Sequence, residues 1–73
     1  MNIILRSRVE ETVLTVTALL SNAEAMIAFG VADKAKYELQ AGVHKAFLKF
    51  IEKGEFNEEQ FYAAHSGWNL LLG

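Results

Sequence analysis

The chain has 73 residues, no cysteine, no proline and a formal net charge of −2. The absence of cysteine excludes disulfides and thiolate metal sites, and the weak negative charge argues against a strongly electrostatic nucleic-acid binder. Apolar residues make up 52% of the chain, whereas a domain this small buries only about 60% of the surface that its unfolded chain exposes. We therefore expect one all-α domain, residues 1–73, that completes its core as a homodimer.

The first predicted element is a long amphipathic helix over residues 3–29. Its apolar residues recur at steps of three and four, which places them on one face of a helix. They are Val9, Thr12, Val13, Val16, Leu19, Leu20, Ala23, Met26 and Ile27. The β-branched run 12–17 also fits a strand, but the periodicity continues well past strand length and favours a helix. Residues 2–5 are the expected exception, extended or frayed, and Gly30 is expected to end the helix in a left-handed conformation.

The second predicted helix covers residues 33–53 and carries two stripes of side chains. The more apolar stripe, expected to be the main face, contains Leu39, Val43, Ala46, Phe47 and Phe50. A semi-polar flank contains Tyr37, His44, Leu48 and Ile51. The flank is either the rim of the core or a dedicated interface. Gly42 costs about 1 kcal/mol relative to alanine inside a helix, and it marks either a close helix crossing or a tolerated imperfection.

The third predicted helix covers residues 58–71 and has the clearest start signal of the three. Asn57 is a good N-cap with Gln60 in the capping-box position, and Phe56 and Phe61 are spaced as a hydrophobic staple. Joints of only a few residues make neighbouring helices turn back on one another. The sequence therefore predicts a long antiparallel helical hairpin with a shorter third helix packed against it.

No constellation of residues for catalysis, cofactor binding or metal binding is recognisable in the sequence. His44 and His65 lack a histidine or carboxylate partner three or four residues away on their own helices, the spacing that a helical metal site requires. We expect His65 to be a half-buried packing residue beside Phe61 and Trp68, and His44 either to pack or to form a pH-sensitive interface. The sequence predicts no enzyme activity, no cofactor and no small-molecule substrate.

A non-catalytic protein-interaction module is the function that these features favour. Such a module would bind itself and a protein partner as a regulator, inhibitor or adaptor, as many small accessory proteins of bacteria and their viruses do. Aromatic anchors dominate interface energetics, so we expect the interface to combine the flank with the last tryptophan. The predicted interface residues are Tyr37, His44, Leu48, Ile51 and Trp68.

A small DNA-binding accessory protein is the first alternative. Lys45, Lys49 and Lys53 recur every four residues and form a basic ridge, which is how helical DNA readers contact phosphates. Glu38 and Glu52 on the same side, and the absence of arginine from the ridge, argue against this reading.

A membrane-surface helix is the second alternative, but acidic residues such as Glu10 and Glu11 occupy the polar face that should be basic. The sequence contains no apolar stretch of about 18 residues or more, so no membrane span is expected. Arg6 and Arg8 precede the apolar run 13–20 as in a signal peptide, yet the two glutamates interrupt the basic region. We therefore expect a cytoplasmic protein.

Overall fold

The structure is a computed structural model that describes residues 2–72. It contains three helices, α1 (Ile3–Ala28), α2 (Lys34–Lys53) and α3 (Glu58–Leu72), and no strand occurs in the part of the chain that it describes. The prediction of an all-helical chain with three helices is confirmed. The observed bounds differ from the expected ones by a single residue, at the end of α1, the start of α2 and the end of α3.

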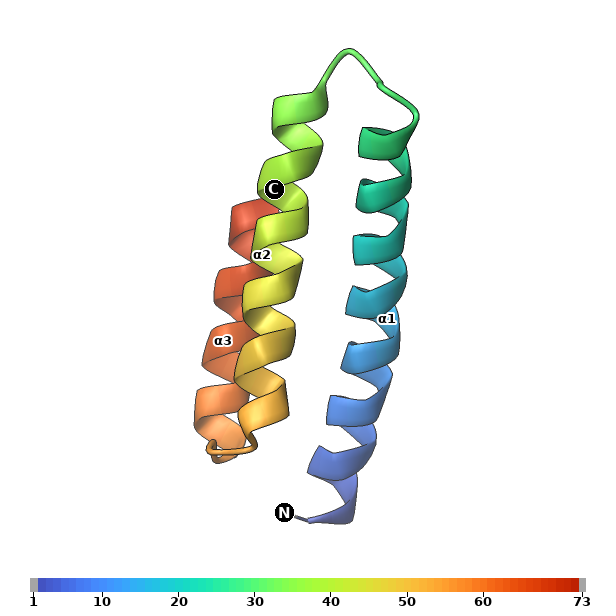
Figure 1. Cartoon of the computed structure of the whole chain (residues 1–73). Helices are drawn as coiled ribbons and strands as arrows, with labels where there is room; N and C mark the ends of the chain where they lie inside the picture. Colours follow the sequence, from blue (N-terminus) through green and yellow to red (C-terminus); the bar gives the residue numbers. More distant parts are fainter. Residues whose placement is uncertain (1, 73) are drawn as a thin grey trace.

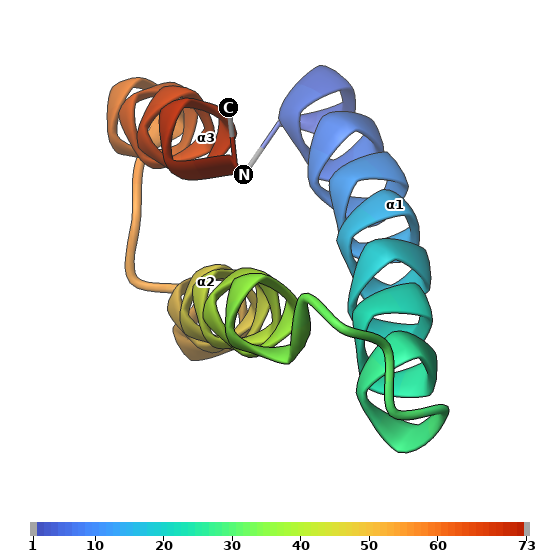
Figure 2. The same cartoon turned by 90° about the horizontal axis from the view of Figure 1, so that it is seen from above.

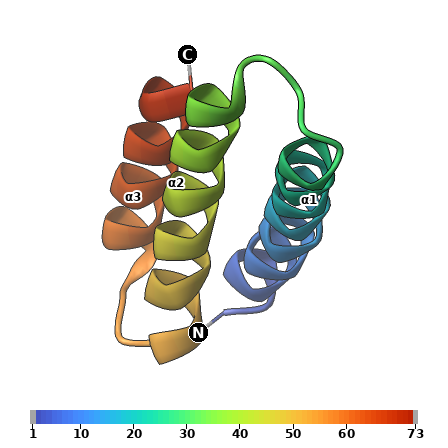
Figure 3. The same cartoon turned by 45° about the horizontal axis from the view of Figure 1, so that its top comes forward.

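The three helices lie along the long direction of a molecule that measures 43 × 18 × 18 Å. Figure 1 shows α1 and α2 side by side and running in opposite directions, with α3 turning back along α2. Seen from above, α1 is tilted, so that its first turns lie nearer to α3 than its last turns do (Figure 2). The two connections lie at opposite ends of the molecule (Figure 3). Helix α2 is therefore the element that packs extensively on both neighbours.

The start of α1 is capped and not frayed. The Oδ1 atom of Asn2 accepts a hydrogen bond of 2.7 Å from the Leu5 backbone N–H, which satisfies one of the free donors of the first turn. Asn2 itself is extended, with φ −75° and ψ 165°. The expectation that residues 2–5 are extended or frayed therefore holds for Asn2 alone, because the cap stabilises the helix from Ile3 onward.

Gly30 ends α1 in the left-handed conformation that the sequence predicts. Its φ is 73°, and its N–H donates to the Ile27 carbonyl at 3.1 Å. The next N–H, of Val31, reaches back to the Met26 carbonyl at 3.3 Å. These two bonds form a Schellman motif, which pairs carbonyls that the helix end would leave free.

The predicted capping box and staple are present at the start of α3. The Asn57 side-chain oxygen accepts from the Gln60 N–H at 2.8 Å, and the Gln60 side-chain oxygen accepts from the Asn57 N–H at 2.9 Å. The rings of Phe56 and Phe61 pack at 5.7 Å between centroids. Together they fix the direction in which α3 leaves the connection.

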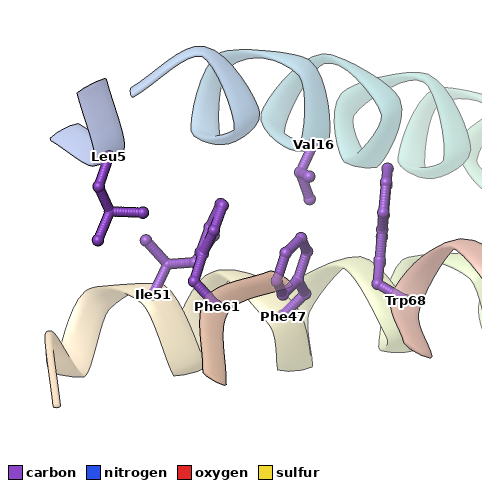
Figure 4. Close-up of a cluster of buried hydrophobic side chains, with 6 residues drawn as sticks. All are labelled: Leu5, Val16, Phe47, Ile51, Phe61 and Trp68. Carbon is purple, nitrogen blue, oxygen red and sulfur yellow. The ribbon is translucent and has the colours of Figure 1, made fainter. Parts of the chain in front are cut away.

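The core is an aromatic cluster that α2 and α3 present to α1. Figure 4 shows Leu5 and Val16 pointing from α1 toward the other two helices. Phe47 of α2 lies at the centre, with its ring centroid 5.3 Å from that of Trp68 and 6.4 Å from that of Phe61. The cluster of buried side chains consists of Leu5, Val16, Phe47, Ile51, Phe61 and Trp68.

The structure divides the core between the two stripes of α2, with the flank more deeply buried than the sequence suggested. The flank faces the core, since His44 and Ile51 are buried together with Ala41. In the expected main face, Phe47 alone is buried, while Leu39 is 68% exposed. The expectation that this stripe forms the main core face holds for Phe47 and in part for Val43 and Phe50, which pack against the core. It is wrong for Leu39 and Ala46, which are exposed. The reason is that the flank faces the space shared by the three helices: Ile51 belongs to the core cluster, and His44 is hydrogen-bonded to Trp68 of α3.

Replacement of Asn57 by alanine should remove the reciprocal cap of α3. We expect Asn57→Ala to lower the free energy of unfolding by about 1 kcal/mol, because the backbone N–H of Gln60 loses the side-chain oxygen that accepts from it. Chemical denaturation measures this directly. Asn69→Ala is the matched control, since Asn69 is exposed within the same helix. An equal effect of the two changes would show that the capping box does not stabilise α3.

Candidate functional site

An apolar groove runs between α2 and α3 and contains the exposed stripe of α2. Its volume is about 590 Å³. The α2 wall is formed by Glu38, Leu39, Gly42, Val43, Ala46, Phe47 and Phe50, and the α3 wall by Ala64, Gly67, Trp68 and Leu71. A single carboxylate, that of Glu38, is present among these lining residues. The groove can therefore bury apolar side chains, and it has no arrangement of groups for acid–base or nucleophilic chemistry.

Large side chains and glycines alternate in the walls of the groove. Leu39 is 68% exposed and Leu71 is 70% exposed. Gly42 and Gly67 each lie inside a helix, and a Cβ atom built on either would meet no atom within 4 Å. Packing inside the chain therefore does not require glycine at either position. Gly42 does not mark a close crossing of α2 with a helix of the same chain.

The shape and composition of this groove suit recognition of a helix. An amphipathic helix binds in an apolar groove through side chains spaced at three, four and seven residues, and small residues let two backbones approach closely. Most groove residues of α2 were assigned by the sequence to the core, because apolar content alone does not say which of two stripes is covered. The signal that could have identified the site is glycine within each of two helices.

The structure places the predicted interface residues along the inward side of α2 and in the core. His44, Ile51 and Trp68 are 2%, 8% and 8% exposed. Tyr37 and Leu48 are half-buried. The three buried residues belong to the core of the chain itself, and a role of the five residues in an interface stays a prediction. Trp68 alone among the five also lines the apolar groove.

The lysine ridge lies on the outer side of α2, and its three members are exposed. Lys45 is drawn toward α1, where its Nζ lies 3.8 Å from the Oε2 atom of Glu24. Lys49 and Lys53 follow the groove residues Ala46 and Phe50 by three positions each. Helical spacing therefore places these two lysines along the α2 border of the groove.

A second, smaller hollow of about 290 Å³ lies between α1 and α3. Besides the core residues Val16, Phe61 and Trp68, it is lined by Arg8, Glu11, Thr12, Thr15, Tyr62 and His65. His65 is half-buried and packs on Trp68 at 5.5 Å and on Phe61 at 6.3 Å between ring centroids. His65 therefore has the packing role that the sequence predicts.

Neither hollow contains a recognisable metal centre. Across residues 2–72, no group of three or more histidine, cysteine or acidic side chains is placed to hold an ion. Among the helices of those residues, none combines the length and the apolar character needed to cross a membrane.

His44 forms the polar contact of the core. Its Nδ1 accepts a hydrogen bond of 3.0 Å from the indole Nε1–H of Trp68, which joins α2 to α3. Burial of the ring lowers the pKa of His44 below its usual value of 6.5, because the charged form loses its hydration. A proton on Nδ1 would also remove the acceptor of the Trp68 bond. The neutral ring is therefore the form that fits the folded chain.

Folding stability should consequently fall in mild acid. His44 in the unfolded chain gains a proton near pH 6.5, whereas the folded chain resists this down to its lowered pKa. The contribution of His44 to the free energy of unfolding is fully present above pH 6.5. It is lost as the pH falls from the pKa of the unfolded chain to the lower pKa of the folded chain, by at most about 1.4 kcal/mol per pH unit. Chemical denaturation at several pH values measures the slope.

The variant His44→Gln removes this titration and keeps a side-chain oxygen that can accept from Trp68. We expect the stability of this variant to lose most of its dependence on pH just below 6.5. Asn69→Ala, at an exposed site of α3, is the control and should retain the wild-type slope. An unchanged slope in His44→Gln would contradict the assignment.

Comparisons of the chain with protein-family models, with curated proteins and with solved structures found no match.

Proposed function

We propose that the chain is a non-catalytic protein-interaction module whose α2/α3 groove receives a helical surface of a protein partner. The observation that carries the proposal is the groove itself, a largely apolar channel between two helices with Leu39 and Leu71 exposed in its walls. Exposed apolar surface that forms one connected groove is typical of docking sites, whereas apolar residues scattered singly are ordinary. A regulator, inhibitor or adaptor uses such a surface without chemistry of its own.

The distribution of polar groups supports a protein partner over a small polar ligand. Small-molecule sites place a few polar groups inside an apolar pocket to fix the orientation of the ligand. Here the single polar side chain of the lining, that of Glu38, is exposed and lies 3.7 Å from Lys34 of the same helix. The remaining lining residues offer apolar contacts, and the backbone is accessible at Gly42 of α2 and at Gly67 of α3.

A photoreactive amino acid placed in the groove tests the proposal in the cells that make the protein. We expect a benzoylphenylalanine at position 39 or 71 to become cross-linked to a polypeptide upon irradiation, because both side chains project into the groove. The product is measured by mass spectrometry, which also tells whether the partner is a second copy or another protein.

Position 14 is the matched control, since Leu14 is also a leucine, is 74% exposed, and lies on α1 away from the groove. Cross-linking at 39 and 71 but not at 14 is the result we expect. Equal cross-linking at all three positions, or products with nucleic acid or lipid in place of protein, would overturn the proposal.

A further inference from the structure

We infer that the occupant of the α2/α3 groove is a second copy of this chain, related to the first by a two-fold axis that runs along the groove. This inference rests on the proposed function, since it requires the groove to be a protein-docking surface. The evidence for self-recognition comes from the charges on the two borders of the groove, from the glycines in its walls and from the size of the face.

The two borders carry opposite charges at the same end of the molecule. Lys49 and Lys53 lie on the α2 border, in its last two turns. Glu59 lies in the first turn of α3, in the exposed column of Ala63, Ser66 and Leu70, which adjoins the groove residue Gly67. The connection between Lys53 and Glu58 is short, so these charges share one end of the α2/α3 pair (Figure 1).

A two-fold axis along the groove makes these charges complementary. Such an axis keeps the shared end of both copies together and sets α2 of one copy beside α3 of the other, again antiparallel. Lys49 and Lys53 of each copy then face Glu59 of the other, on both sides of the interface. An isologous contact of this kind produces a closed dimer with two antiparallel helix pairs, as in four-helix bundles.

The glycines lie where the two helix pairs would approach most closely. Phe47 stacks on both Phe61 and Trp68, which fixes the relative heights of α2 and α3. Counting from Phe47 at a rise of 1.5 Å per residue, Gly42 and Gly67 lie within about one turn of each other along the groove. Each has open space in place of a Cβ atom, so a helix of the second copy could approach both backbones.

The α2/α3 face is large enough for a small dimer interface. The chain exposes 5252 Å² in total, and a standard specific interface takes about 800 Å² from each partner. Helix α2, with its 20 residues, is about 30 Å long, and the molecule is 18 Å wide, so the α2/α3 face supplies an interface at the small end of the specific class. A dimer would also cover Leu39 and Leu71, the most exposed leucines of the groove.

The variant Gly42→Leu tests whether the groove is needed for dimerisation without disturbing the folding of the chain. Gly42→Leu should keep or raise the helix content of the chain, because the site has room and leucine is the better helix former. It should weaken dimerisation about tenfold or more, because the side chain fills the space of the second copy. Ser21→Leu, at an exposed site of α1, is the matched control. Sedimentation equilibrium measures the dimer, and circular dichroism measures the helix content.

A charge exchange tests the two-fold arrangement itself. The double variant Lys49→Glu/Lys53→Glu should dimerise poorly, and so should Glu59→Lys, because each places like charges across both sides of the interface. Mixed together, the two variants should form a heterodimer in about tenfold excess over either homodimer, since both sides then carry opposite charges. Native mass spectrometry distinguishes the three species. In the control experiment the partner variant is Glu58→Lys in place of Glu59→Lys. Glu58 lies on the side of α3 away from Gly67, so this mixture should give no excess of heterodimer.

A statistical mixture of dimers, or a wild-type chain that stays monomeric into the millimolar range, would overturn the inference. Cross-linking at positions 39 and 71 separates this outcome from failure of the proposed function. If the wild-type chain is monomeric and becomes cross-linked there to a different polypeptide, the proposed interaction function is supported and the homodimer is rejected. If the chain is monomeric and becomes cross-linked to no polypeptide, both the proposed function and the homodimer are rejected.

Discussion

The hydrogen bond from Trp68 to His44 lies inside an apolar cluster and ties α3 to α2 beneath α1. A buried indole N–H without an acceptor is costly, so the bond fixes how the two helices lie together. Once α3 is held in this position, Phe47 becomes enclosed by aromatic rings. The inward side of α2 is then available to α1. The adjoining stripe remains open and forms the groove with α3.

A chain of 73 residues cannot cover every apolar side chain that it contains. Helix α1 extends well past the end of α3 and lies along the inward side of α2 (Figures 1 and 2). The face of the α2/α3 pair on the other side has no helix of its own chain to cover it. The proposed docking of a protein there follows from this shortage of covering surface. The exposed groove residues, such as Leu39 and Leu71, contribute recognition, whereas Phe47 and Trp68 line the groove and also belong to the core.

Local signals in the sequence were sufficient for the helices and their ends. Gly30 and the pair Asn57 and Gln60 act within a few residues of themselves, so their hydrogen bonds could be predicted from spacing. Which of the two stripes of α2 is buried could not be predicted in this way, because it depends on how α2 packs against the other helices. Apolar content favoured Leu39 for the core, yet His44 and Ile51 of the other stripe are the residues that are buried. A single pairing between α2 and α3, the bond to Trp68, explains why a histidine is buried there.

The division of α2 into a core side and a groove side is best tested with one pair of variants. Ile51→Asp and Leu39→Asp introduce the same carboxylate into the two stripes. Ile51 is 8% exposed and Leu39 is 68% exposed, so a charge at position 51 should cost several kcal/mol and unfold the chain. The charge at position 39 should leave the helix content intact, as measured by circular dichroism and thermal unfolding. A folded Ile51→Asp variant beside an unfolded Leu39→Asp variant would contradict the account.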